Sequence, residues 1–346
     1  MRSSPIPQNT EHPLGFFALA QYALKEERRR AEAAEIAWSS FEVFRGRIRN
    51  YLLPYFRESA PSEIGLRQIN AFVAELQTKN LKASSIRLIL TSLRRVLYYA
   101  YLNGWSQSLP VMPRIRSDST PRGGFTPREY LCLWHEARRQ CTASSSQGCA
   151  NAFCQEVRYF SKDHPMFESM PHLIRFMVNS FVRPTDLRWI QHRHIQICRG
   201  HHTYLRLELP ESKRHSSQII SMPAAVGIYE RLLESARASG RDRLDDFLFL
   251  PEVENRKTAM VLLDLYFRRV LQASGLRVGK RGQNRTLYSL RHTAITFRLL
   301  FGRGIDLLTL ARNARTSVEM IERFYASELS AEMNVALLHS RRSFGK

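Results

Sequence analysis

The stretch that decides the fold begins with LYSLRHT (residues 287–293) and ends with IERFY (residues 321–325). Apolar residues recur at helical spacing after Arg291, so the first segment predicts an amphipathic helix with an arginine near its start. Tyr288 lies three residues before this arginine and therefore projects from a neighbouring part of the same helix surface. Such a stretch is suited to holding a phosphate with an arginine and attacking it with the phenol of Tyr325.

Turn signals divide this stretch into three helices. His292, four residues after Tyr288, shares the surface of the first helix, and Gly302 and Gly304 end that helix. Asp306 then caps a short helix over residues 307–311. The segment Thr316-Ser317-Val318-Glu319 is typical of a capping box, with Thr316 as the cap of the last helix.

Two upstream segments carry further basic residues. An apolar helix from residue 171 ends near Arg183. Residues 203–209 and 218–222 alternate between apolar and polar, which predicts two strands of a small antiparallel sheet. Lys213 lies in the turn between these strands, and it is the sole lysine between Lys162 and Lys257.

The first third of the chain predicts helices and no strand. We divide the chain into an arm and helix (1–34), a helical DNA-binding domain (35–105), a Ser-, Pro- and Arg-rich linker (106–125) and a catalytic domain with a C-terminal tail (126–346). The candidate DNA-binding residues lie on the helix 84–102, in the linker and in the hairpin turn, and they are Arg87, Arg94, Arg95, Arg114, Arg116 and Arg214.

Charge indicates the class of partner. The 346 residues include 52 basic and 31 acidic side chains, a net charge of +21. Such an excess destabilises a folded chain by self-repulsion unless a polyanion shares the surface, and nucleic acid is the usual polyanion. Most of the basic residues are arginine, which either reflects a preference for planar, bidentate phosphate donors or a coding bias.

Cysteine usage and hydropathy exclude several other classes. The five cysteines and the absence of a secretory segment favour a reducing compartment. Cys141, Cys149, Cys154 and His164 form a conceivable zinc set, but their spacing fits no common zinc finger, so we expect neither a metal nor a cofactor. No apolar run is long enough to span a membrane, and we expect a soluble cytoplasmic, nucleoid-associated protein.

Taken together, the motifs resemble a known enzyme family. Arg183, Lys213, the segment 290–293 (LRHT) and Tyr325 resemble, in order and spacing, the active site of the tyrosine recombinases (phage-integrase family), in particular proteobacterial site-specific integrases. The resemblance covers roughly residues 35 to 335. It implies a mainly α fold with a small antiparallel sheet, in which a helical core-binding (SAM-like) domain precedes a mixed α/β catalytic domain.

The resemblance also implies a mechanism. The Tyr325 phenol would attack a phosphodiester of double-stranded DNA and form a 3′-phosphotyrosyl link, so that no ATP is needed. Arg183 and Arg291 would stabilise the charge of the transition state, and Lys213 would protonate the leaving 5′-oxygen. The family further implies a homotetramer on paired DNA sites and accessory DNA-bending or directionality proteins.

Two positions depart from the family pattern. Tyr288 replaces the usual histidine three residues before the second arginine, and a phenol with a pKa of about 10 is a poor base at neutral pH. Thr316 replaces the usual histidine or tryptophan nine residues before the nucleophile, and it either donates to the phosphate or caps its helix. His292 and His215 are candidates to compensate.

These departures keep two alternatives open. One is a catalytically weakened DNA-binding accessory or regulatory protein of the same fold, and the other is a type IB topoisomerase-like enzyme. An amphipathic tail, residues 330–346, predicts docking on a neighbouring subunit.

Overall fold

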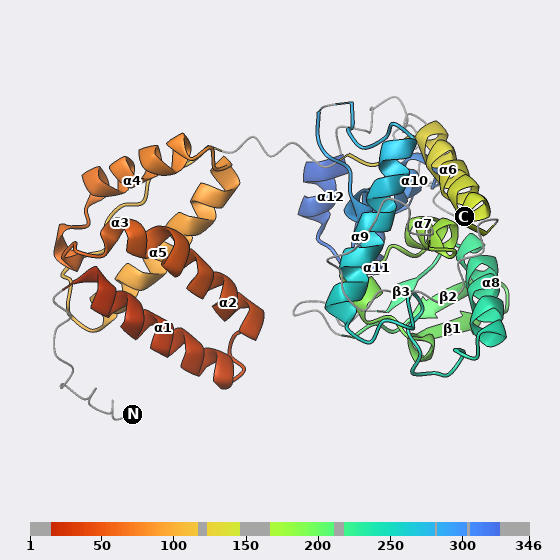
Figure 1. Ribbon diagram of the computed structural model, residues 1–346, viewed down its shortest axis with the longest axis horizontal. Coiled ribbons are helices and arrows are strands. Elements are labelled where there is room, and N and C mark those ends of the chain that lie inside the picture. Colours follow the sequence, from red (N-terminus) through yellow and green to blue (C-terminus); the bar gives the residue numbers. More distant parts are fainter. Residues whose placement is uncertain are drawn as a thin grey trace, which may run out of the picture. The chain divides into compact units, whose positions relative to one another are not determined.

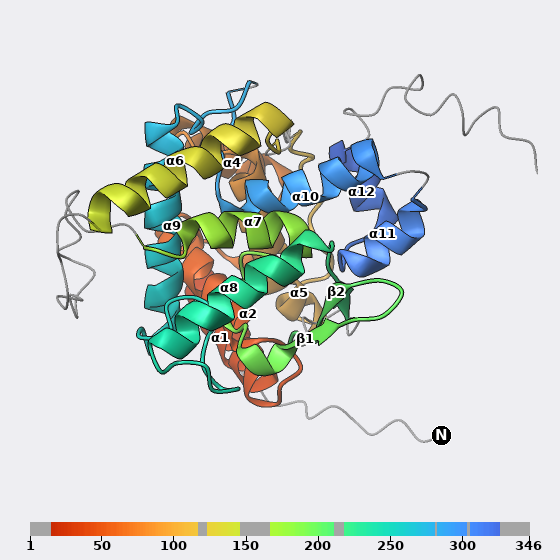
Figure 2. The same cartoon turned by 90° about the vertical axis from the view of Figure 1, so that its right-hand side faces the viewer.

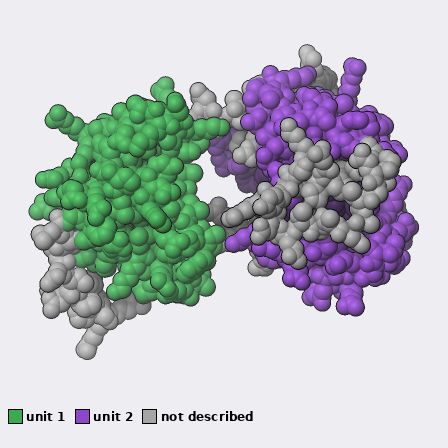
Figure 3. All heavy atoms as spheres, in the orientation of Figure 1, with its two compact units in different colours: residues 1–119 green, residues 120–346 purple. Residues whose placement is uncertain are grey.

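The chain folds as two units, residues 1–119 and residues 120–346 (Figure 3). The computed structural model describes residues 15–116, 123–145, 167–210, 218–280, 282–302 and 305–325, without the side chains of 143–145 and 324–325. The boundary between the two units falls inside the predicted linker.

Unit 1 is helical over all of its described residues. Its elements are α1 (Phe16–Glu32), α2 (Trp38–Arg47), a π-helical turn (Ile48–Leu52), α3 (Leu53–Phe56), a 3-10 turn (Pro61–Glu63), α4 (Leu66–Thr78) and α5 (Ala83–Leu102) (Figure 1). The π turn lies just before Pro54, where a proline in a regular α-helix would lose a backbone hydrogen bond and clash with the preceding turn. The wider turn lets the helical backbone continue through Pro54 to Phe56.

The first helix belongs to the core of unit 1, although the sequence placed residues 1–34 apart from the helical domain. Phe16 and Leu19 of α1 are buried in the same cluster as Leu93 of α5. Glu27 of α1 is fully buried and accepts hydrogen bonds from Arg95 (3.0 Å) and Tyr99 (2.8 Å) of α5. A buried carboxylate requires such partners, so this group fastens α1 to α5.

Unit 2 surrounds one central helix with other helices and a small sheet. Its elements are α6 (Pro127–Ser145), α7 (Met170–Ser180), 3-10 turns at Asp186–Arg188 and His192–His194, β1 (Ile195–Cys198), β2 (Tyr204–Leu207), β3 (Ile219–Ile220), α8 (Ala224–Ala238), α9 (Arg256–Ala273), α10 (Leu287–Phe301), α11 (Leu307–Asn313) and α12 (Val318–Tyr325). Helix α7 packs against α6, α8 and α10 (Figure 2). This position explains why α7 reads as an apolar run, because it is covered on several sides.

The sheet is antiparallel with the order β1-β2-β3. The two predicted strands are confirmed as the shorter β2 and β3. The sequence missed β1, which pairs Ile195 with Leu207 and is only four residues long. The prediction of a mainly α fold with a small antiparallel sheet is therefore confirmed. No helix in the described ranges is long and apolar enough to cross a membrane.

A buried arginine organises the loop before α9. Arg256 is 5% exposed and donates to the carbonyl oxygens of Arg188 (3.1 Å), Phe249 (2.9 Å), Leu250 (2.8 Å) and Val253 (3.0 Å). Burial lowers the pKa of this guanidinium to about 10, so it stays charged at neutral pH. Arg256 therefore has a structural role that is separate from the predicted active site.

Candidate active site

The site is built around Arg291 on α10. Thr286 caps this helix by accepting a hydrogen bond from the backbone N–H of Tyr288 (3.3 Å). Arg291 is 2% exposed, and its Nη1 and Nη2 donate to the carbonyl oxygens of Phe181 and Ala314, respectively. One guanidinium thus joins the end of α7 to the turn between α11 and α12.

Arg183 reaches the same turn from the other side. It follows α7, whose C-cap Phe181 has a left-handed backbone (φ +57°). The backbone N–H of Arg183 donates to Asp186 Oδ2 (2.8 Å), and its Nη2 donates to the carbonyl oxygen of Arg315. The structure therefore brings the two predicted arginines onto consecutive carbonyl groups, those of residues 314 and 315.

The turn between α11 and α12 is also fixed to the sheet. The side chain of Asn313 accepts a hydrogen bond from the backbone N–H of Ile220 (2.7 Å) and donates to its carbonyl oxygen (2.9 Å). Ile220 lies in the edge strand β3, so Asn313 pairs with that strand as a backbone would. This contact holds the turn beside β3, the strand that follows the predicted hairpin turn.

A third arginine lies in this turn. Arg315 has a left-handed backbone (φ +51°), a conformation that costs a non-glycine residue about 1–2 kcal/mol. Its side chain is only 1% exposed, with Nη1 3.9 Å from Asp186 Oδ1 and Nη2 3.4 Å from the carbonyl oxygen of Pro210. Pro210 is the last described residue before the predicted hairpin turn.

The charges in this site favour an anion. The described part contains three guanidinium groups (Arg183, Arg291 and Arg315) and one carboxylate (Asp186). Cations removed from water are stabilised only by partners of opposite charge or by hydrogen-bond acceptors. A phosphate, which accepts several hydrogen bonds and carries negative charge, suits such a cluster.

The expected cap of α12 is corrected by the structure. Ser317 is the N-cap, because its Oγ accepts a hydrogen bond from the backbone N–H of Met320 (3.2 Å). Thr316 precedes the cap, and its backbone N–H donates to the carbonyl oxygen of Ala311 (2.9 Å), which closes the end of α11. The helix starts one residue later than the capping-box pattern predicted.

Tyr288 and His292 contact each other on α10. Their ring centroids are 5.0 Å apart and the rings meet edge to face at 65°. His292 is 7% exposed, whereas Tyr288 is partly exposed. The two side chains therefore form one aromatic pair beside Arg291, as the helical spacing predicted.

Several predicted residues lie outside the described residues. They include the hairpin residues Lys213, Arg214 and His215, the tail 330–346 and three members of the suggested zinc set (Cys149, Cys154 and His164). Tyr325 is the last residue of α12, and its side chain lies outside the part that the structure describes. Within the described ranges, no group of His, Cys, Asp and Glu has the arrangement of a metal site.

The predicted DNA-binding arginines of unit 1 differ in their surroundings. Arg87 and Arg94 are exposed on α5. Arg114 and Arg116 are exposed on a segment whose Ile115 packs against the core of unit 1. Arg95 instead pairs with the buried Glu27, so much of its charge is already neutralised within the protein.

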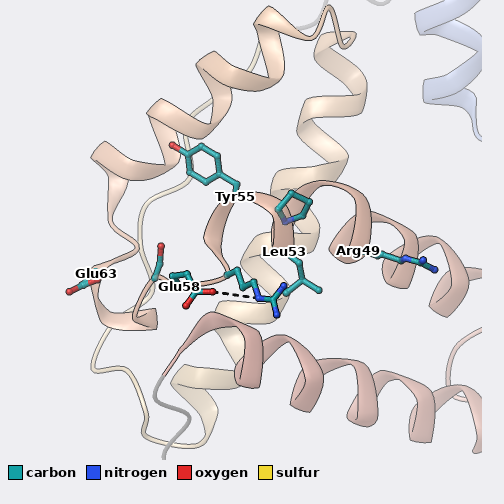
Figure 4. A pocket seen from close by; sticks show the side chains of 8 residues that line it. Arg49, Leu53, Tyr55, Glu58 and Glu63 are labelled. Atoms are coloured by element: carbon teal, nitrogen blue, oxygen red, sulfur yellow. Dashed lines mark ion pairs between the residues drawn. The ribbon is translucent and has the colours of Figure 1, made fainter.

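A hollow of about 700 Å³ lies in unit 1 (Figure 4). Its lining includes Arg49, Tyr55 and Arg57, and Arg57 Nε lies 3.5 Å from Glu58 Oε1. None of the predicted catalytic residues lines it, so we assign it no part in the chemistry.

Three contributors to the site were missed by the sequence analysis: Asp186, Asn313 and Arg315. Asp186 follows Arg183 by three residues, a spacing at which an Asp side chain commonly accepts a hydrogen bond from the backbone, and this signal was available. Asn313 and Arg315 gave no comparable signal, because their roles depend on contacts with Ile220 and Pro210, far away in the sequence.

Comparison with known proteins supports the fold. No protein-family model and no curated protein matches the sequence. Among solved structures, a lambda integrase fragment dimer bound to a COC′ core site is similar with a TM-score of 0.62 and 16% identity, covering 88% of this chain and 94% of that one. A lambda integrase tetramer bound to a Holliday junction gives a TM-score of 0.64 and 17% identity over 91% of this chain and 78% of that one.

A Tn1549 transposon integrase in complex with a circular intermediate DNA is also similar. The TM-score is 0.62 and the identity 13%, covering 92% of this chain and 98% of that one. At such identities the similarity establishes the fold. The chain thus has the fold of these integrases, in agreement with the fold that the resemblance of its motifs implied.

Proposed function

We propose that this protein is a site-specific DNA recombinase that cleaves and rejoins DNA strands through a 3′-phosphotyrosyl intermediate. One observation carries the proposal: Arg183 and Arg291 converge on the turn that precedes α12, and α12 ends at Tyr325. Two clustered guanidiniums and a tyrosine on the adjoining helix match the chemistry of phosphoryl transfer to a phenol.

The arginines supply charge stabilisation in this proposal. Arg183 and Arg291 donate to the non-bridging oxygens of the scissile phosphate, where negative charge grows in the pentacoordinate transition state. The burial of Arg291 strengthens this interaction, because charges attract more strongly away from water.

The covalent step conserves the phosphodiester energy. The Tyr325 oxygen loses its proton and forms a bond to phosphorus, while the bond from phosphorus to the 5′-oxygen breaks. Lys213 gives a proton to that leaving oxygen. Attack by a 5′-hydroxyl on the phosphotyrosine reverses the step and rejoins the strands, so neither a metal nor a cofactor takes part in the proposed reaction.

The departures from the family pattern are assigned supporting roles. Tyr288 donates a hydrogen bond to the phosphate, and its ring contact with His292 keeps that histidine beside it. His292, together with His215, serves as the base that the phenol at position 288 cannot provide. Thr316 donates its hydroxyl to the phosphate, since Ser317 caps the helix in its place.

Double-stranded DNA is the proposed partner. The exposed arginines Arg87 and Arg94 on α5, Arg114 and Arg116 after it, and Arg214 contact its backbone. We propose a homotetramer on paired sites, assisted by DNA-bending or directionality proteins near the nucleoid. The similar lambda integrase tetramer on a Holliday junction supports this assembly.

Covalent trapping tests the proposal. A pool of duplexes with a randomised core is nicked in one strand, so that the short fragment released by cleavage diffuses away and the adduct cannot be resealed. We expect a protein–DNA adduct that withstands denaturation in the wild type and is absent from Tyr325→Phe. Binding without an adduct would favour the regulatory alternative, and relaxation of supercoils without recombinants would favour the topoisomerase.

A further inference from the structure

We propose that Arg315 is a positioning residue that holds Arg183 in place for its action on the scissile phosphate. This inference rests on the proposed function, because it assigns a role within the same phosphate site. Three observations carry it: the left-handed backbone of Arg315, the burial of its side chain, and the partners that it shares with Arg183.

The backbone conformation is the first observation. A position with φ +51° is suited to glycine, yet it holds an arginine with a side chain that is 1% exposed. Backbone strain of this kind persists where the surroundings enforce it, and it concentrates at functional sites. A long, charged side chain folded into the interior at such a position indicates a specific role for its guanidinium.

The contacts of that guanidinium identify the role. Asp186 presents Oδ1 to Nη1 of Arg315 (3.9 Å) and Oδ2 to the backbone N–H of Arg183 (2.8 Å). The carbonyl oxygen of Arg315 accepts a hydrogen bond from Nη2 of Arg183. Arg315 therefore restrains both ends of Arg183, the backbone through Asp186 and the guanidinium through its own carbonyl group.

A third contact extends this restraint to the sheet. Arg315 Nη2 donates to the carbonyl oxygen of Pro210 (3.4 Å), just beyond β2. The planar guanidinium can contact Asp186 and Pro210 at once because its donors point in fixed, divergent directions. The arginine thus links the Arg183 loop and the end of β2 to the turn that begins α12.

The test separates positioning from folding with Arg315→Gly. Glycine relieves the backbone strain but also removes the contacts of the buried guanidinium, so the melting temperature of the variant is measured first and cleavage is compared at a temperature where both proteins are folded. On the nicked duplex recovered by trapping, we expect single-turnover adduct formation to slow about 100-fold, as misplacement of a reacting group by about 1 Å can do. The exposed Arg312→Ala, which removes the same charge from α11, is the matched control.

Cleavage of an uncharged substrate distinguishes a positioning role from a purely structural one, because only a positioning role makes the loss of rate depend on the charge of the phosphate. A methylphosphonate at the scissile position lacks the negative charge that Arg183 stabilises. On this substrate, Arg315→Gly should therefore slow adduct formation by less than about tenfold, and Arg183→Ala should show the same reduced effect. Equal losses on both substrates, or a wild-type rate on the phosphodiester, would overturn the positioning role.

A double-mutant cycle checks the route through Asp186. If Arg315 acts through Asp186, then adding Arg315→Gly to Asp186→Asn should slow cleavage by no more than about twofold further. Fully additive losses would overturn this route. Failure of the wild type to form a Tyr325-dependent adduct would instead overturn the proposed function, and the inference with it.

Discussion

Replacement of Arg291 by lysine should damage stability and catalysis together. The arginine bridges two buried carbonyl groups, those of Phe181 and Ala314, through two different nitrogens. A lysine keeps the charge but carries a single ammonium on a flexible stem, so it cannot span both acceptors. At least one charge-assisted hydrogen bond is lost, so one of the two buried carbonyl groups loses its arginine donor.

The expected magnitudes follow from these contacts. Loss of one hydrogen bond to a charged group costs about 1.5–3 kcal/mol of unfolding free energy. Loss of one donor to a charge that develops in the transition state costs about 100- to 1,000-fold in rate. We expect Arg291→Lys to show both effects, with the affinity for uncleaved DNA changed far less than the cleavage rate.

Two assays measure these effects. Urea unfolding gives the change in stability, and single-turnover formation of the Tyr325 adduct at saturating DNA gives the change in rate. Arg298→Lys is the matched control, since it makes the same substitution on α10 at a partly exposed position. A loss of stability with an unchanged cleavage rate would refute the phosphate clamp, and an unchanged stability would refute the bridging contacts.

Three further predictions concern other parts of the chain. Arg256→Met should destabilise unit 2 by at least about 1.5–3 kcal/mol, the cost of one lost hydrogen bond to a charged group, because buried carbonyl groups lose their donor. Urea unfolding checks this, with the exposed Lys257→Met as the control. Burial favours the neutral form of Glu129, but hydrogen bonds from Thr126 and Arg285 outweigh it and lower the pKa. The stability that Glu129 contributes is therefore present above about pH 4.3 and is lost as the pH falls through the lowered pKa. The melting temperature of the wild type should exceed that of Glu129→Gln at about pH 6, and this difference should shrink at about pH 3. Arg94→Ala should reduce the salt dependence of DNA binding by about one unit of slope, as measured by titration at several salt concentrations.

Each of these predictions has an outcome that contradicts it. Equal stabilities of Arg256→Met and Lys257→Met would show that the carbonyl contacts are unimportant. A difference between wild type and Glu129→Gln that stays constant with pH would remove the assigned proton linkage. Arg28→Ala, whose arginine pairs with Glu32 on α1 (2.9 Å), is the control for DNA binding, and an equal change in slope would contradict a specific role for Arg94.

Local patterns sufficed for much of the fold. The helix over residues 84–102, the Asp306 cap of α11 and the alternation of β2 are local properties of the sequence, and the structure confirms each of them. The sequence failed to predict the short strand β1 and placed the start of α12 one residue too early, because short segments carry too few residues for a clear pattern. The strand β1 depends on its pairing with β2, and either Thr316 or Ser317 could have capped α12.

The sequence by itself determined the class of fold, the helical faces and the set of residue types that pointed to phosphate chemistry. Only the tertiary structure decided that Arg183 and Arg291 meet at the carbonyl groups of Ala314 and Arg315, and that a third arginine is buried beside them. The physical reason is that helical periodicity specifies which side of an element is buried, whereas the partner it meets depends on how all the elements pack. Arg315 looks like a surface residue in the sequence, and its burial against Asp186 and Pro210 gives it a role.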